Sequence, residues 1–124
     1  MKKILFIEDE SALQKTFGKV LEKESFEVIP ALDGEIGLRL AKSEKPDLIL
    51  LDLILPKLNG FEVLQKIKED EEIKNIPIIV LTNLETMDNV DRAIRLGATT
   101  YLVKANYTLK EVISKVKKTL KGNH

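Results

Sequence analysis

The chain has 124 residues, with 20 acidic and 20 basic side chains, one histidine and no cysteine. This length suits one domain with a substantial core and is too short for a catalytic domain plus a second module. The balanced charge gives no general attraction to nucleic acid or an anionic membrane, and the lack of cysteine excludes disulfides, thiolate metal sites and thiol nucleophiles. Any partner must therefore be recognised by a local surface.

Apolar runs of strand type alternate with helical patterns along the chain. We expect the first strand at residues 3–7 and then a helix with Ser11 as its N-cap, whose apolar residues recur at helical spacing: Leu13, Phe17, Val20 and Leu21. Residues 26–31 predict the second strand, which should lie at a sheet edge because Pro30 can donate no ladder hydrogen bond. The dipeptide at 33–34 opens a second helix that ends before the next proline.

The middle of the chain continues the alternation. Residues 48–53 are apolar on both faces, as expected for a central parallel strand covered by helices on each side. A loop ending at 59–60 precedes a helix that carries the apolar residues Phe61, Leu64 and Ile67. Residues 76–81 predict a fourth strand, and a helix from about 88 to 96 follows, with Gly97 at its C′ position.

The fifth strand is expected at 100–103, and a capping box at 108–111 opens the last helix, whose apolar residues are Val112, Ile113, Val116 and Leu120. Because parallel neighbours cannot be joined by tight turns, five strand–helix units with short connections imply right-handed crossovers. We therefore predict a three-layer α/β fold with a five-stranded parallel sheet and five helices. One domain at 1–121 and a tail at 122–124 are expected.

Two apolar runs bear on localisation. The N-terminal run at 4–7 is too short for the core of a signal peptide, since acidic residues follow it at once. The longest run, at 48–55, is far below the ~20 residues of a membrane span and is interrupted by Asp52. We expect a cytoplasmic protein without a membrane association.

Polar residues follow four of the five predicted strands. Ligands of open parallel sheets bind outside the carboxyl ends of the strands, where this sequence places Glu8, Asp9, Asp52, Thr82 and Lys104. Carboxylates crowded there repel one another and raise the pKa of at least one of them, unless a cation lies among them. Hard oxygen ligands suit Mg²⁺, and an ammonium beside them can reach an anion.

Asp52 is the most unusual of these residues because it lies within the apolar segment LILLDLILP at 48–56. An ionised carboxylate loses hydration there, so a fold that keeps it charged must supply partners. Each strand-end residue also has a structural explanation, such as capping a turn or remaining solvated at the surface. Four strands that deliver suitable groups at one edge favour a functional site over four independent coincidences.

Four segments in chain order, ILFIEDES, LILLDLILPKLNGFEVL, IPIIVLT and ATTYLVKA, resemble the receiver domain of two-component response regulators over essentially the whole chain. The resemblance implies a flavodoxin-like sheet with strand order 2-1-3-4-5. It also implies Mg²⁺-dependent transfer of a phosphoryl group to Asp52 from a sensor histidine kinase or phosphotransfer protein. Such a domain catalyses its own phosphorylation and dephosphorylation and is not a turnover enzyme on external substrates.

The resemblance also assigns the metal site. It implies that Asp52 is the phospho-acceptor and that Glu8, Asp9 and Asp52 hold Mg²⁺ together with the backbone carbonyl of Ile54. Glu8 stands where the family more often has an aspartate.

A conformational switch is implied by the same resemblance. The Thr82 hydroxyl would move to a phosphoryl oxygen, Lys104 would pair with the phosphoryl group, and the Tyr101 ring would change its exposure. We expect a downstream effector to bind a face formed by Tyr101 and the helices that start near Asp88 and Thr108.

Two departures from the family pattern affect these expectations. Ala105 follows the lysine where the family usually has proline, often after a cis bond. Since a cis bond before another residue costs ~2.5 to 4 kcal/mol, the sequence leaves both the cis and the trans form open. Ile54 and Leu84 are apolar at positions that flank the attacking water in this family, so we expect slow self-dephosphorylation.

Three other kinds of protein share part of this pattern. A haloacid-dehalogenase-like phosphatase needs a general acid two residues after its nucleophile, where Ile54 cannot move a proton. A flavodoxin-like binding module needs a first loop that cradles phosphate, which the acidic residues 8–10 would repel. A degenerate receiver would keep the fold and only bind protein. The sequence argues against this alternative because it retains the complete set of strand-end residues: Asp9, Asp52, Thr82 and Lys104.

The sequence says less about the downstream partner and the oligomeric state. With no helix-turn-helix pattern and no basic patch in the sequence, we expect no direct contact with nucleic acid. The chain is expected to be either a stand-alone receiver or a piece of a longer regulator, and a monomer or a weak phosphorylation-dependent dimer.

Overall fold

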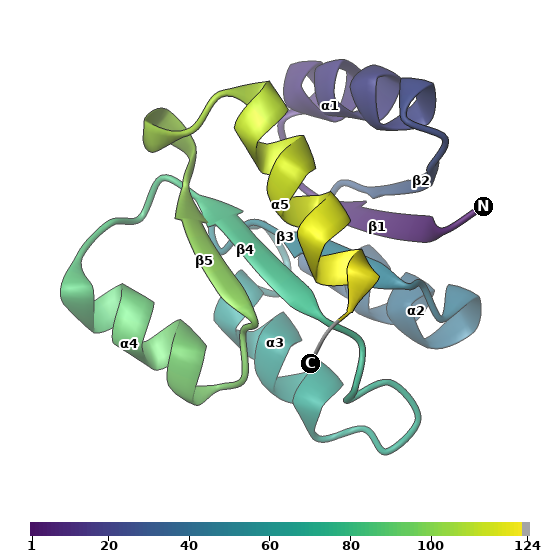
Figure 1. The fold of residues 1–124 in the computed structure, drawn as a ribbon. Helices are drawn as coiled ribbons and strands as arrows, with labels where there is room; N and C mark the ends of the chain where they lie inside the picture. Colours follow the sequence, from purple (N-terminus) through teal and green to yellow (C-terminus); the bar gives the residue numbers. More distant parts are fainter. Residues whose placement is uncertain (123–124) are drawn as a thin grey trace.

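All five predicted strands form and pair in parallel in the computed structural model, which describes residues 1–122 (Figure 1). The strands are β1 Lys3–Ile7, β2 Glu27–Ala31, β3 Leu48–Leu51, β4 Ile78–Thr82 and β5 Thr100–Val103. Their order, β2-β1-β3-β4-β5, confirms the predicted fold class and the edge position of the strand that carries Pro30. Residues 123 and 124 of the predicted tail lie outside the described residues.

Helices cover both faces of the sheet. They are α1 Ser11–Lys23, α2 Gly34–Glu44, α3 Gly60–Lys68, α4 Met87–Arg95, α5 Leu109–Lys121 and a short 3₁₀ helix, η1 Lys104–Asn106. Helices α1 and α5 pack on one face, and α2, α3 and α4 lie on the other (Figure 1). None of the helices within residues 1–122 combines the length and apolar composition needed to cross a bilayer.

Alternation along the strands builds two cores, one on each face of the sheet. The core under α2, α3 and α4 includes the strand residues Leu5, Ile7, Ile49, Leu51, Ile78 and Val80. The core under α1 and α5 includes Ile4, Phe6, Leu48, Leu50, Ile79, Leu81 and Leu102. Burial on both faces explains why the central strands are continuous apolar runs rather than alternating ones.

The prediction that Ser11 is an N-cap is wrong. Glu10 occupies the cap position with an extended backbone and no capping side-chain hydrogen bond, and Ser11 is the first helical residue. The reason is the short connection from β1, in which the Glu10 N–H bonds to Glu8 Oε2 at 3.0 Å and so anchors the turn before the helix. Other predicted boundaries differ by one or two residues, which is usual at element ends.

Two helix-end predictions are confirmed. Gly97 follows the C-cap of α4 with φ +111°, a conformation that favours glycine. The capping box of α5 is complete, because the Thr108 side chain accepts from the Glu111 N–H at 3.1 Å and the Glu111 side chain accepts from the Thr108 N–H at 2.8 Å.

Two glycines make a matched test of this packing. A Cβ added at Gly34 would lie 1.7 Å from the Leu58 carbonyl oxygen, whereas one added at Gly18 would meet no heavy atom within 4 Å. We expect Gly34→Ala to lower the free energy of unfolding by at least about 2 kcal/mol. Gly18→Ala, in the interior of α1, should raise it by about 0.5–1 kcal/mol. Urea unfolding measures both, and equal effects of the two substitutions would contradict this packing.

Candidate functional site

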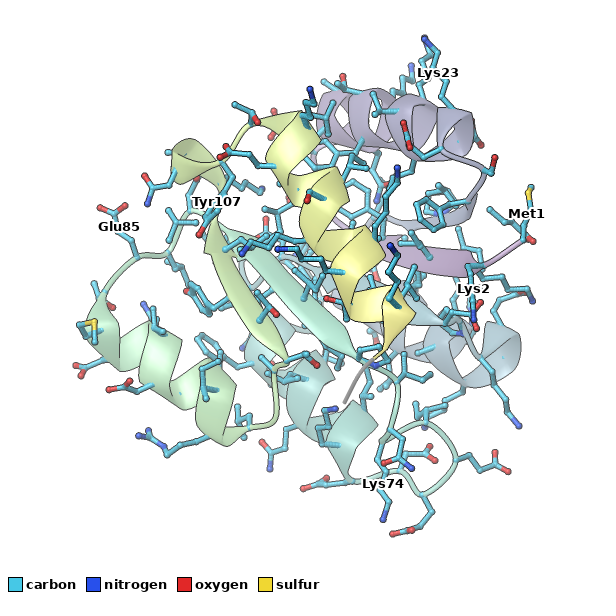
Figure 2. The ribbon with its side chains drawn as sticks, viewed as in Figure 1. Met1, Lys2, Lys23, Lys74, Glu85 and Tyr107 are labelled. Atoms are coloured by element: carbon cyan, nitrogen blue, oxygen red, sulfur yellow. The ribbon has the colours of Figure 1, made fainter. Side chains whose placement is uncertain are left out.

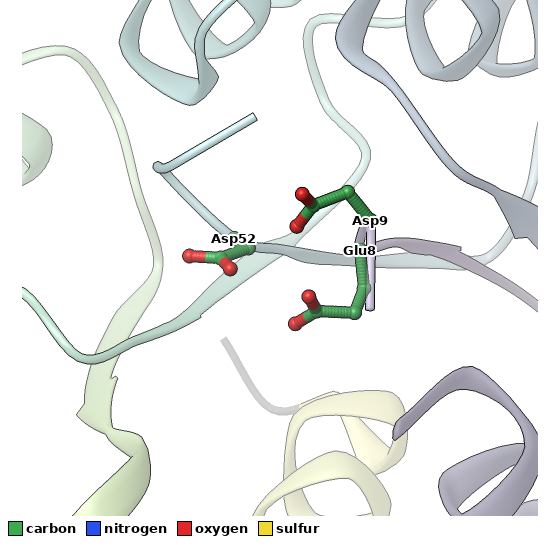
Figure 3. Close-up of side chains that lie close together, drawn as sticks. All are labelled: Glu8, Asp9 and Asp52. Atoms are coloured by element: carbon green, nitrogen blue, oxygen red, sulfur yellow. The ribbon is translucent and has the colours of Figure 1, made fainter. Parts of the chain in front are cut away.

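The carboxyl ends of β1 and β3 bring three carboxylates together. Glu8, Asp9 and Asp52 offer carboxylate oxygens that all lie within 4.8 Å of one another (Figure 3). The two strands are parallel neighbours, with Ile7 paired to Leu51, and the Asp52 N–H extends this ladder by donating to the Ile7 carbonyl at 3.0 Å. The sheet topology therefore fixes the backbone from which these side chains project.

Lys104 is the charged partner of Asp52. Its Nζ lies 3.1 Å from Asp52 Oδ2 and 2.6 Å from Glu8 Oε1. Burial favours the neutral amine, but the hydrogen bond to Glu8 and the charge of Asp52 outweigh it, and the pKa of Lys104 is raised above its ordinary value. One ammonium thus holds two carboxylates that come from two different strand ends.

Glu8 is the most deeply buried of the three carboxylates. Its pKa is raised, mainly by burial and to a smaller extent by the charge of Asp52, while hydrogen bonds from Lys104 and the Glu10 N–H oppose the rise. The expectation that one carboxyl of the cluster has a raised pKa is therefore confirmed. The main cause is desolvation, and the crowding of charges, through Asp52, is a smaller cause.

Thr82 and Tyr101 both hold the main chain of Leu84. Thr82 is buried at the end of β4, and its Oγ1 accepts from the Leu84 N–H at 3.4 Å. The Tyr101 hydroxyl donates to the Leu84 carbonyl at 2.7 Å. Burial and, secondarily, the charge of Asp52 raise the pKa of Tyr101 above its ordinary value. Both residues are therefore tied to the connection between β4 and α4.

The two connections that follow β4 and β5 lie at the same edge of the sheet as the carboxylates. Figure 2 labels one residue of each, Glu85 after β4 and Tyr107 after β5. The described residues contain no cis peptide bond, so the Lys104–Ala105 bond is trans. The chain turns there through η1, which begins at Lys104 itself.

Ile54 contacts this site through its main chain, while its side chain is exposed. Its N–H donates to Asp52 Oδ1 at 3.2 Å, which leaves both carboxylate oxygens of Asp52 hydrogen bonded. Its side chain is 55% exposed, an unusual exposure for an apolar residue beside buried charges. An apolar surface therefore lies next to the acidic cluster.

Sequence reasoning did not single out two features. Gln14 is a buried polar residue of α1, and its position three residues before Phe17 and seven before Leu21 marks it as lying on the apolar face of the helix. The Arg92 guanidinium lies 4.1 Å from the centre of the Phe61 ring and joins α4 to α3. The helical spacing could have revealed Gln14, whereas the contact across two helices depends on their packing.

The donor set fits a divalent cation. Three carboxylates lie together, and one ammonium pairs with two of them, Glu8 and Asp52, so carboxylates outnumber the cation in this cluster. Hard oxygen donors of this kind, with Asp9 open to solvent, match the preference of Mg²⁺ for one or more carboxylates together with water.

Comparison with known proteins identifies the family. The response regulator receiver domain model matches residues 4–117. The DNA-binding dual master transcriptional regulator RpaA of Synechocystis is 36% identical over 121 residues, which cover 98% of this chain and 50% of RpaA. The chain thus spans about half the length of this relative.

Two further comparisons involve proteins of similar size. Protein PilH of Pseudomonas aeruginosa is 35% identical over 104 residues, which cover 84% of this chain and 86% of PilH. The crystal structure of the Mn²⁺-bound form of response regulator Rcp1 matches with a TM-score of 0.81 and 35% identity, covering 95% of this chain and 91% of that one.

Replacing Lys104 tests the charge balance of the site. Lys104→Met leaves Glu8 and Asp52 without their cation, and we expect it to lower the free energy of unfolding by about 3 kcal/mol near neutral pH. Lys117→Met is the matched control, because Lys117 pairs with Glu24 at the half-exposed surface and should matter by less than about 1 kcal/mol. Urea unfolding measures both, and equal losses would contradict the account.

The loss of unfolding free energy caused by Lys104→Met should also depend on pH. Lys104 opposes the rise in the Glu8 pKa, so its removal raises that pKa further. The folded variant then binds a proton more readily than the parent, and a protonated Glu8 needs no cation. The stability deficit should therefore shrink as the pH falls from neutral toward the raised pKa of Glu8. Unfolding curves at several pH values check the sign of this change.

Proposed function

Because the chain belongs to the response regulator receiver domain family, we propose that it accepts a phosphoryl group on Asp52 in two-component signalling. The donor is a sensor histidine kinase or a phosphotransfer protein. One observation carries the proposal. The buried Asp52 carboxylate is held by the Lys104 ammonium at 3.1 Å and by the Ile54 N–H at 3.2 Å, beside two further carboxylates.

The chemistry that we propose is transfer of a phosphoryl group from a phosphohistidine nitrogen. An O–P bond forms at a carboxylate oxygen of Asp52 while the N–P bond breaks, and the donor nitrogen keeps the electron pair. Catalysis of this kind is mainly positioning and electrostatic stabilisation. Lys104 contributes both, since it orients the carboxylate in the resting state and offers a positive charge to the incoming phosphoryl oxygens.

We propose that Glu8, Asp9, Asp52 and the backbone carbonyl of Ile54 hold Mg²⁺. Support comes from the donor set of three clustered carboxylates and from the Mn²⁺-bound form of the similar protein Rcp1. When bound, the ion supplies positive charge that reduces repulsion between the carboxylates and a phosphoryl group.

The proposed output is a switch at the α4–β5–α5 face. Thr82 and Tyr101 now bond to the two main-chain groups of one residue, Leu84. If Thr82 turns to a phosphoryl oxygen, the Leu84 N–H loses its partner and the Tyr101 contact on the same residue is weakened. Such a change would bias the β4–α4 connection between two arrangements, which is how a local charge can alter a distant surface.

The biological setting is proposed on the same basis. We assign residues 1–121 to the receiver domain, which is supported by the end of α5 at Lys121. We propose that the protein is cytoplasmic and binds a downstream effector at the α4–β5–α5 face. We propose no direct contact with nucleic acid or a membrane. It would be a monomer or a weak phosphorylation-dependent dimer, and it would modify itself rather than turn over external substrates.

The proposed function is tested by intact mass spectrometry after incubation with a small-molecule phosphodonor and Mg²⁺. We expect the parent to gain one phosphoryl group, because the nucleophile and its charges are already assembled. Asp52→Asn should gain none, and a parent sample without Mg²⁺ should gain far less. An Asp52→Asn protein that is phosphorylated as fully as the parent would refute Asp52 as the acceptor.

The exposed Ile54 side chain generates a second prediction. It should shield the phosphoryl group and cannot orient a water, so the phosphorylated parent should lose its phosphoryl group slowly. Ile54→Asn supplies a polar side chain at this position and should shorten the lifetime several-fold. The decay of the phosphorylated mass measures both rates. A parent lifetime equal to or shorter than that of the variant would exclude this role for Ile54.

A further inference from the structure

Helix α1 contains a buried polar side chain that the proposed phosphoryl transfer does not use. Gln14 is only 7% exposed and lies on the helix face that also carries Phe17 and Leu21. An apolar residue would be the ordinary choice at such a position, because a buried amide must find partners for its donors and its acceptor. The contacts of Gln14 indicate what the amide does there.

The amide nitrogen of Gln14 bonds to three main-chain carbonyls from two strand ends. Nε2 lies 2.7 Å from the Phe6 oxygen, 3.1 Å from the Glu8 oxygen and 3.1 Å from the Ala31 oxygen. The Ala31 carbonyl also accepts the Glu8 N–H at 2.9 Å. Gln14 therefore joins α1 to the carboxyl ends of both β1 and β2.

The same residue also bonds to the other side of Asp9. Its backbone N–H donates to the Glu10 carbonyl at 3.0 Å, while its side chain holds the Glu8 carbonyl. The connection between β1 and α1 consists of residues 8–10 alone. The Glu10 contact is the ordinary first bond of the helix, which any non-proline residue would make, whereas the Glu8 contact depends on the glutamine side chain and holds the main chain just before Asp9.

The orientation of the amide shows which of its groups matters. Oε1 of Gln14 is buried without a hydrogen-bond partner within residues 1–122. The reverse orientation would place this oxygen against three carbonyl oxygens, which repel it. The two N–H hydrogens of the amide therefore serve three main-chain acceptors, so that one hydrogen is shared, and the amide oxygen has no hydrogen-bond partner within residues 1–122.

We propose that Gln14 is a positioning residue for the acidic pair and that it sets the affinity of the cluster for Mg²⁺. Groups that orient metal ligands without touching the metal often change metal affinity by about 10–100-fold when they are replaced. The inference rests on the proposed function, since it takes Glu8 and Asp9 as ligands. It adds a residue of α1 that acts on them through the main chain.

The test measures binding of Mg²⁺ alone by isothermal titration calorimetry, without any phosphodonor. Gln14→Met keeps the length of the side chain and removes its hydrogen bonds, and the dissociation constant should rise by about tenfold. Leu21→Ala is the control, because Leu21 is fully buried in the same helix but far along it from residues 8–10. It should lower the stability of the fold and leave the dissociation constant within about twofold of the parent value, in contrast to the tenfold rise expected of a positioning residue.

Each outcome decides a different claim. If the parent binds Mg²⁺ and Gln14→Met binds it equally well, the positioning role is wrong and the proposed function stands. If the folded parent does not bind Mg²⁺, the metal-dependent function fails and this inference fails with it. An equal loss of affinity in Leu21→Ala would mean that general destabilisation explains the effect and would overturn the proposal.

A second variant covers the case in which Gln14→Met does not fold. Gln14→Asn keeps the amide but shortens the side chain by one methylene, so that it cannot reach all three carbonyls from the same backbone position. We expect weaker Mg²⁺ binding than in the parent. Binding as tight as that of the parent would count against the proposal even without data for Gln14→Met.

Discussion

The site depends on one interaction, the contact of a single ammonium with two buried carboxylates. Lys104 follows the last strand, yet it neutralises Glu8 after the first strand and Asp52 after the third. Without it, burial would favour the protonated form of Glu8 still more strongly, because the hydrogen bond from Lys104 opposes the rise in the Glu8 pKa. Because one ammonium pairs with only two of the three clustered carboxylates, this edge of the sheet keeps an excess of negative charge that a divalent cation would neutralise.

This charge balance also explains how the fold can connect chemistry to a surface. A parallel sheet places all carboxyl strand ends at one edge, so the residues that follow β1, β3 and β5 can form ion pairs with one another, and the connection after β4 lies at the same edge. In the connection between β4 and α4, Leu84 is held by the buried Thr82 hydroxyl at the end of β4 and by the Tyr101 hydroxyl from β5. In our proposal a phosphoryl group on Asp52 competes for Lys104 and Thr82, and the contacts on Leu84 change as a result.

Much of this arrangement could be predicted from the sequence because it follows from topology. Continuous apolar runs fixed the strands, and strand ends located Asp52 and Lys104 at one edge. The incorrect prediction, the N-cap of α1, depends on how side chains are placed within the three-residue connection at 8–10. Ser11 resembles a cap, but Glu8 anchors the turn instead. Helical spacing is enough to place Gln14 on the apolar face of α1, but the role of its amide depends on three carbonyl partners that only the packing of α1 on the strands brings together.

The most direct test of the central claim is nitrogen-15 NMR of the lysine side-chain ammonium groups before and after phosphorylation. Before phosphorylation the buried ion pair should give Lys104 a resonance that exchanges slowly with water and disappears in Lys104→Met. Phosphorylation should shift this resonance more than that of any other lysine, because the ammonium changes partners. A phosphorylated protein in which the Lys104 resonance stays unchanged would contradict the account, since the charge balance would then not depend on this side chain.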